Sequence, residues 1–235
     1  MRTFGSRFAT FVISVGLLLG LVLNAPSARI TPYDALTAGA PISRVAIVGD
    51  SYTNGTAIGG QGANAWPVRA WRTLARQGVQ VVADVAAEGR AGYGVRGEKG
   101  SLFGDLTPRA VKPDDALVVF YGSRNDHGAD PNVLSGQIFN AFALAHRIAP
   151  TARLLVIGPP WPTADVPPAV LQIRDILAFQ SMLAGATFID PIAAGWFVDR
   201  PDLIGRDGVH PTDAGHVYMA DKIAPLIGDQ LPRRV

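Results

Sequence analysis

The sequence predicts an α/β protein, a three-layer α/β/α sandwich built on a five-stranded parallel sheet. Five short apolar runs recur along the chain, and longer segments with apolar residues at helical spacing lie between them. The runs are apolar throughout rather than alternating, which is typical of strands that helices cover on both faces. Alternation of such strands with helices favours a parallel sheet.

The predicted strands share apolar and β-branched residues and stop at turn-forming residues. The first stops at Gly49 and the fourth at Gly158, which two prolines follow. The five predicted strands span residues 44–48, 78–85, 116–121, 153–157 and 187–189.

Four segments carry apolar residues at the spacing of one helix face. In the first of them, Trp66, Ala70 and Leu74 recur every four residues, and arginines occupy other positions. The last begins with Thr212, a residue that favours the N-cap position. The predicted helices span residues 66–76, 131–148, 168–183 and 212–227.

The N-terminal segment has the composition of an export signal. Residues 1–28 hold Arg2 and Arg7 and no acid, and residues 8–23 are almost wholly apolar. This pattern predicts a signal peptide or an N-terminal membrane anchor, with membrane association through residues 8–28. Residues 29–43 are predicted to be a linker and residues 44–235 one domain. Either fate of the leader exports the domain, which is then secreted or held at the outer face of the cytoplasmic membrane.

Charge and cysteine content exclude several classes of function. The formal net charge of +2 resides in the leader, so the remaining domain is close to neutral and has no basic stripe for phosphates. Nucleic-acid binding therefore lacks physical support. The chain has no cysteine, which excludes a disulfide framework, thiolate zinc sites and cysteine catalysis.

Chemically active residues follow the predicted strands, at the sheet edge where α/β proteins place their sites. The first strand is followed by Gly-Asp-Ser-Tyr and the second by a glycine-rich stretch. The third is followed by Gly-Ser-Arg-Asn-Asp, and Asp-Gly-Val-His-Pro precedes the last helix. These four blocks occupy residues 49–52, 89–94, 122–126 and 207–211.

The blocks contain the parts of a serine nucleophile. A serine hydroxyl needs a neighbouring base, for which histidine is suited near neutral pH, and a carboxylate must orient the imidazole. We expect Ser51, His210 and Asp207 to fill these roles. The backbone N–H groups of Ser51 and Gly92 and the amide of Asn125 can stabilise the oxyanion.

Three further residues are candidates for substrate contact. Arg124 lies inside the third block, His127 directly follows it, and Trp161 follows the fourth strand. Surface or packing roles for all three remain open from the sequence alone.

The four blocks together resemble the SGNH (GDSL-like) hydrolase family over residues 44 to about 228. The resemblance implies a flavodoxin-like α/β fold and cleavage of ester or related acyl bonds. By matching motif positions it makes Ser51 the nucleophile and an oxyanion donor. Gly92 and Asn125 then complete the oxyanion hole, and Asp207 and His210 complete the triad.

Two positions depart from the family pattern. Ser123 stands where the third block usually has glycine, and Ala87 stands where an asparagine is common. Neither change removes a catalytic group.

We expect no cofactor and no metal. Residues 92–97 match Gly-x-Gly-x-x-Gly, but a dinucleotide site needs a helix directly afterwards, and the residues that follow are poor helix formers. No pair of histidines with nearby acids has metal-ligand spacing.

The sequence therefore predicts an exported serine esterase that forms an acyl-enzyme on Ser51. Its expected substrate is a small-molecule, lipid or glycan ester with an acyl or O-acetyl group. Two alternatives remain open: an acyltransferase acting on an envelope glycan or lipid, and a catalytically silent envelope binding module.

Overall fold

The structure of the protein is a computed structural model in which residues 42–232 are described. The predicted leader, residues 1–28, and residues 29–41 of the predicted linker lie outside the described residues. The described strands are β1 (Ile42–Gly49), β2 (Gln80–Ala87), β3 (Leu117–Tyr121), β4 (Arg153–Ile157) and β5 (Thr187–Ile189).

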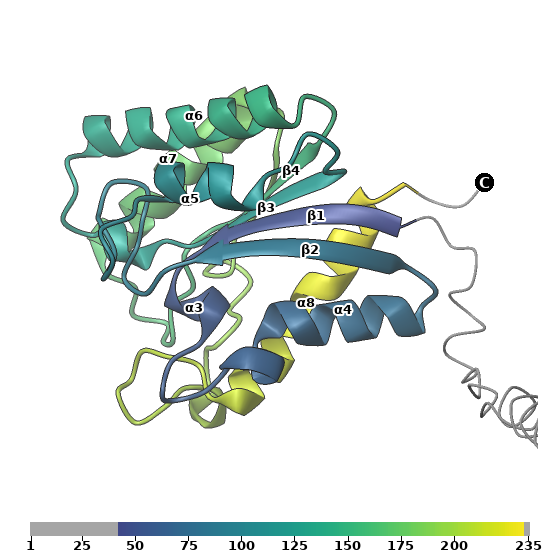
Figure 1. Ribbon diagram of the computed structural model, residues 1–235. Coiled ribbons are helices and arrows are strands. Elements are labelled where there is room, and N and C mark those ends of the chain that lie inside the picture. Colours follow the sequence, from purple (N-terminus) through teal and green to yellow (C-terminus); the bar gives the residue numbers. More distant parts are fainter. Residues whose placement is uncertain (1–41, 233–235) are drawn as a thin grey trace, which may run out of the picture. The chain divides into compact units, whose positions relative to one another are not determined.

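All neighbouring strands of the sheet are parallel, in the order β2-β1-β3-β4-β5 (Figure 1). This is the flavodoxin-like order, in which the chain reverses its winding direction between β1 and β3. The predicted fold class is therefore confirmed. The reversal opens a crevice at the carboxyl ends of these two central strands, where α/β proteins bind ligands.

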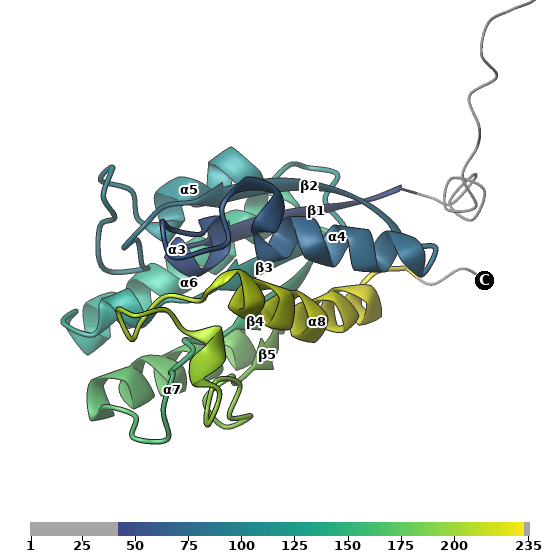
Figure 2. The same cartoon turned by 90° about the horizontal axis from the view of Figure 1, so that it is seen from below.

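Helices cover both faces of the sheet, as Figures 1 and 2 show from two sides. Helices α5, α6 and α7 pack on one face, and α4 and α8 pack on the other. The short α3 follows β1 directly. The helices are α3 (Ser51–Asn54), α4 (Trp66–Arg76), α5 (Phe103–Ala110), α6 (Pro131–Ile148), α7 (Pro168–Leu183) and α8 (Asp213–Gln230).

The central strands divide their side chains between two cores. In β1, Ala46 and Val48 pack toward α5 and α6, whereas Val45 and Ile47 pack toward α4 and α8. All four side chains are fully buried. Alternation of side chains across a strand explains why the run must be apolar at every position.

The structure differs from the predicted elements at three points. Strand β2 spans Gln80–Ala87, two residues later than the predicted 78–85. Ile42 and Ser43, predicted to lie in the linker, form the start of β1. Helix α5 was not predicted, although Phe103, Leu106 and Ala110 are buried on its inner face. The helix has only eight residues and contains Pro108, so its apolar pattern is too short and too interrupted to stand out in the sequence.

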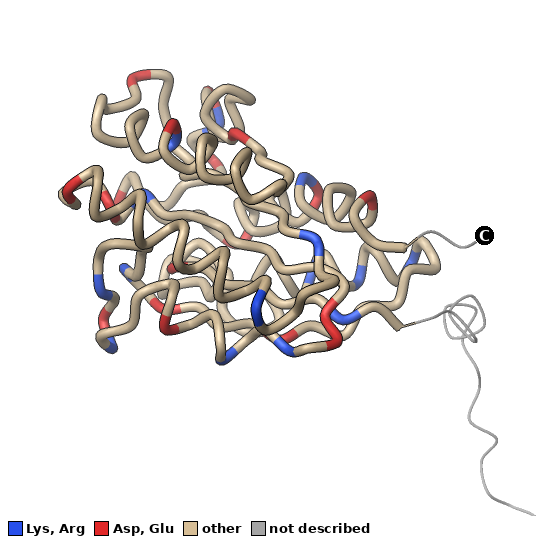
Figure 3. The backbone as a smooth tube through the Cα atoms, turned by 90° about the horizontal axis from the view of Figure 1, so that it is seen from above, with Lys and Arg blue, Asp and Glu red and all other residues tan. Residues whose placement is uncertain are grey.

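The described part of the chain carries interspersed charges. Figure 3 shows positive and negative positions mixed along the backbone rather than segregated onto one element. Within residues 42–232, no helix is both long enough and apolar enough to cross a membrane.

Thr212 caps the N-terminus of α8, which directly follows the loop that carries His210. The Thr212 hydroxyl accepts a hydrogen bond from the Gly215 N–H at 3.2 Å. We expect Thr212→Ala to lower the free energy of unfolding by about 1 kcal/mol through loss of this cap. Urea denaturation measures the change, and Thr212→Ser, which keeps the hydroxyl, is the control. Equal losses in both variants would contradict a capping role.

Candidate active site

The turn after β1 presents Ser51 at the carboxyl edge of the sheet. Asp50 caps α3 in an extended conformation, and its carboxylate accepts the Tyr52 N–H at 2.9 Å. Ser51 is the first residue of this helix and is 7% exposed. Its own N–H has no acceptor among the described residues, since the first N–H groups of a helix have no partner within it.

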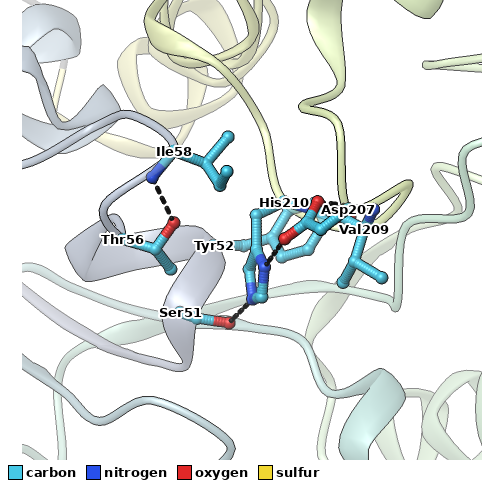
Figure 4. A network of polar contacts seen from close by, with 7 residues as sticks. All are labelled: Ser51, Tyr52, Thr56, Ile58, Asp207, Val209 and His210. Atoms are coloured by element: carbon cyan, nitrogen blue, oxygen red, sulfur yellow. Dashed lines mark hydrogen bonds and ion pairs between the residues drawn. The ribbon is translucent and has the colours of Figure 1, made fainter.

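The structure brings Ser51, His210 and Asp207 together, although more than 150 residues separate the serine from the other two. Ser51 Oγ lies 3.2 Å from His210 Nε2, and His210 Nδ1 lies 2.7 Å from Asp207 Oδ2 (Figure 4). An ionised Asp207 accepts the Nδ1–H, which leaves the Nε2 lone pair facing the serine hydroxyl. This arrangement can remove a proton from Ser51 as the serine attacks.

Asp207 both closes the loop and orients the imidazole. Its Oδ1 accepts the N–H groups of Val209 and His210, each at 3.0 Å. Partial burial opposes ionisation, but the hydrogen bonds from the His210 side chain and from these two N–H groups lower the pKa of Asp207 to about 2. The carboxylate is therefore charged at neutral pH.

The two other predicted oxyanion donors, Asn125 and Gly92, lie near each other, and both already donate hydrogen bonds within the protein. The Asn125 amide nitrogen donates to Asp50 Oδ2 at 3.2 Å and to the Ala91 carbonyl at 2.9 Å. The Gly92 N–H donates to the Val95 carbonyl at 2.8 Å. Each must exchange such a partner before it can bind an oxyanion, whereas the Ser51 N–H needs no exchange.

Asp126 organises the turn that carries Gly92. Its carboxylate accepts the N–H groups of Tyr93, Gly94 and Val95 at 2.9, 2.8 and 3.0 Å. A Cβ atom at Gly92 would lie 2.4 Å from Asp126 Oδ1, so this close approach requires glycine. Asp126 is not among the site residues predicted from the sequence, although it directly follows Asn125 in the third block.

The departure at Ser123 has a structural explanation. Its fully buried hydroxyl donates to the Ala91 carbonyl at 3.1 Å and accepts the Asn125 N–H at 3.0 Å. Ser123 therefore joins the third block to the second and holds Asn125 in place. The other departure, Ala87, ends β2, and its carbonyl accepts the Asn54 side chain at 3.5 Å.

Asp50 is a buried acid that is not among the site residues predicted from the sequence. It is 2% exposed and lies beneath the site between Tyr52 and Asn125. Burial raises the pKa of Asp50 to about 7, and the nearby negative charge of Asp126 acts in the same direction. The Asp50 carboxyl group therefore changes its protonation state near neutral pH.

A cavity of about 730 Å³ opens above Ser51 and His210. The three predicted substrate contacts, Arg124, His127 and Trp161, all line it, and so does Asn125. The Arg124 guanidinium stacks on the Trp161 ring, with its central carbon 4.4 Å from the ring centroid. Gly92 does not line this cavity.

The start of α8 supports one wall of the cavity, formed by residues 54–61. Asp213 accepts the Gly60 N–H at 2.8 Å, and His216 Nδ1 accepts the Trp66 N–H at 3.3 Å. Burial lowers the pKa of His216 to about 4, so the ring is neutral at pH 7. A Cβ atom at Gly60, which has φ +77°, would lie 1.9 Å from the His216 ring, so this contact also requires glycine.

The described residues 42–232 contain no group of three or more His, Asp or Glu side chains placed to hold a metal ion. The arrangement instead offers a hydroxyl nucleophile, a base and a cavity beside them.

Known proteins share this sequence pattern and fold. A model of the GDSL-like Lipase/Acylhydrolase family matches residues 47–218. The GDSL lipase Rv0518 of Mycobacterium tuberculosis (strain ATCC 25618 / H37Rv) is 58% identical over 229 residues, which cover 96% of this chain and 99% of that protein.

Solved structures resemble the chain at lower identity. TesA superposes with a TM-score of 0.65 at 17% identity, covering 80% of this chain and 100% of TesA. A family two carbohydrate esterase from Clostridium thermocellum gives 0.62 at 16% identity, covering 80% of this chain and 64% of its own. A phospholipase A1 from Streptomyces albidoflavus NA297 gives 0.56 at 16% identity, covering 80% and 99%. At such identities the likeness shows the fold alone.

The raised pKa of Asp50 predicts a pH dependence of stability. The native state keeps the Asp50 proton up to about pH 7, whereas the unfolded chain releases it near 3.8. The contribution of Asp50 to stability is complete below the pKa of the unfolded chain, and it is lost as the pH rises through the pKa of the folded protein. We expect this group to remove about 2 kcal/mol from the free energy of unfolding between pH 5 and pH 7.

Urea denaturation at both pH values measures this loss in the wild type and in Asp50→Asn. The variant lacks the titrating group. Between pH 5 and pH 7 its free energy of unfolding should therefore fall by about 2 kcal/mol less than that of the wild type. Parallel pH dependence in the two proteins would contradict the assignment.

Proposed function

Because the chain belongs to the GDSL-like lipase/acylhydrolase family, whose members are ester hydrolases, we propose that it hydrolyses carboxylic esters through an acyl-enzyme on Ser51. The observation that carries the proposal is the chain of contacts from Ser51 Oγ to His210 Nε2 and from His210 Nδ1 to Asp207. Ser51, at one end of this series of contacts, lines a cavity large enough for an ester, and Asp207, at the other end, is an ionised carboxylate.

In the first half of the reaction, His210 Nε2 takes the Ser51 hydroxyl proton while Oγ attacks the ester carbonyl carbon. Asp207 stabilises the imidazolium that forms. The tetrahedral intermediate collapses as its bond to the alcohol oxygen breaks, and His210 gives its proton to that oxygen. In the second half, a water molecule loses a proton to His210 and attacks the acyl carbonyl carbon. The bond from that carbon to Ser51 Oγ then breaks, His210 returns its proton to Oγ, and the carboxylic acid leaves.

The oxyanion requires hydrogen-bond donors whose bonds to the oxygen strengthen as negative charge develops on it. The Ser51 N–H is available for this role. Asn125 reaches it by exchanging its hydrogen bond to Asp50 or Ala91 for one to the oxyanion. Gly92 takes part if its N–H exchanges the Val95 carbonyl for the oxyanion.

The cavity is lined by apolar and by polar side chains, which supports an ester with an apolar and a polar part. The acyl chain fits against the apolar side chains and the alcohol against the polar ones. The apolar lining residues include Trp161, Pro167, Ala169 and Val170, and the polar ones include Arg90, Glu98 and His127. Lipid and glycan esters, including O-acetyl esters, both have this character.

We also propose that the domain is exported. Support comes from Arg2 and Arg7 followed by the apolar residues 8–23. N-terminal sequencing of the mature protein from the native host tests the proposal: a start near residue 28 means cleavage, and an intact terminus in the membrane fraction means an anchor. An intact terminus in the cytosol would contradict export.

Substitution of the triad tests the reaction itself. We expect Ser51→Ala and His210→Ala each to lower kcat for p-nitrophenyl acetate by on the order of 10³-fold or more, because each removes a group that forms or breaks bonds. Ser51→Ala should also abolish covalent labelling by a fluorophosphonate. His146→Ala, a histidine of α6 that does not line the cavity above Ser51, is the matched control. An inactive wild type, or an active Ser51→Ala, would contradict the proposal.

The role of Trp161 is tested with a series of esters that differ in acyl length. Loss of an apolar wall costs binding energy in proportion to the acyl surface that it covers. We expect Trp161→Ala to raise KM roughly 10-fold for octanoyl esters and much less for acetyl esters. Trp161→Phe keeps an aromatic wall and serves as the control. Equal changes for short and long esters would place the acyl chain elsewhere.

A further inference from the structure

The loop that carries His210 is closed upon itself. The Gly205 N–H donates to the His210 carbonyl at 2.8 Å, and the Gly208 N–H donates to the Gly205 carbonyl at 2.9 Å. Asp207 binds the two N–H groups that follow Gly208. These bonds define the shape of the loop, but they do not define where it stands relative to Ser51.

Tyr52 joins this loop to the nucleophile helix. It directly follows Ser51, and its hydroxyl donates to the carbonyl of Val209, the residue before His210. Within residues 42–232, this is the one hydrogen bond between loop 205–210 and α3 other than the contact of His210 with Ser51. Figure 4 shows the Tyr52 side chain extending from α3 toward the loop.

The core holds the Tyr52 ring in place. The residue is 1% exposed, and its ring meets those of Tyr121 and Phe197 edge-on at centroid distances of 6.3 and 6.2 Å. The Asp50 carboxylate fixes its backbone N–H. A ring so enclosed holds its hydroxyl at a constant position, from which it anchors the Val209 carbonyl.

We infer that Tyr52 is a positioning residue that sets the approach of His210 Nε2 to Ser51 Oγ. This inference rests on the proposed function. The Val209 carbonyl belongs to the peptide group that leads into His210, so its displacement moves the imidazole. Nucleophilic attack needs the base within hydrogen-bond reach, and the present distance of 3.2 Å is at the upper limit of that range.

Tyr121 supplies a matched control. It is as buried as Tyr52, lies in the same aromatic cluster, and its hydroxyl donates to Met219 Sδ at 3.3 Å. It has no hydrogen bond to loop 205–210. Tyr52→Phe and Tyr121→Phe therefore each delete one buried hydroxyl, but only the first removes a hydrogen bond to loop 205–210.

The experiment measures kcat and KM for a p-nitrophenyl ester and the second-order rate of fluorophosphonate labelling in the full-length wild type and both variants. We expect Tyr52→Phe to lower kcat by about 10-fold, with KM within twofold, because a displacement well under 1 Å of a reacting group has effects of this size. The labelling rate should fall by a similar factor. Tyr121→Phe should keep both quantities within twofold of the wild type.

Rates are compared at a temperature at which circular dichroism shows all three proteins to be folded, so that lost stability is not mistaken for lost alignment. Unchanged kcat in Tyr52→Phe, or equal losses in both variants, would overturn the positioning role while leaving the proposed function intact. A wild type that neither hydrolyses esters nor reacts with fluorophosphonate would overturn the proposed function and this inference with it.

Discussion

The parallel pairing of β1 with both β2 and β3 is the constraint on which the site depends. It brings the carboxyl ends of three strands to one edge, although β3 lies about seventy residues beyond β1 in the chain. The turn with Ser51, the turn with Gly92 and the block with Asn125 follow these ends directly. Because β1 and β3 are buried on both faces, their register tolerates no slip, and the three turns keep a constant spacing.

Buried carboxylates hold the turns at this edge in shape. Asp126 binds three consecutive N–H groups of the glycine-rich turn, and Asp50 binds the first turn of α3 and the Asn125 amide. Burying such groups is costly unless hydrogen bonds satisfy them. The loops of the site are thereby held by polar networks rather than by apolar packing. This explains how segments with many glycines present ordered side chains.

The base reaches the nucleophile by a different route. Asp207 and His210 lie in a loop just before α8, on no strand of the sheet, and this loop meets the rest of the site through few polar contacts. Helix α8 contributes indirectly, because Asp213 at its start holds the cavity wall at residues 54–61 through the Gly60 N–H. Solved structures below 20% identity share this fold, so the fold by itself does not specify a substrate.

The sequence by itself determined the strands, the four long helices and the positions of Ser51, Asp207 and His210. These follow from local signals: apolar runs, helical spacing, a serine placed just after a strand, and an Asp-x-x-His-Pro block just before the last helix. Only the tertiary structure shows the contacts that join segments far apart in the chain. The roles of Asp50, Asp126 and Ser123 and the contact of Tyr52 with Val209 come from pairs far apart in the chain. Helix α5 likewise is stabilised by the sheet that it covers rather than by its own short, proline-containing sequence. For this reason no local sequence pattern predicts it.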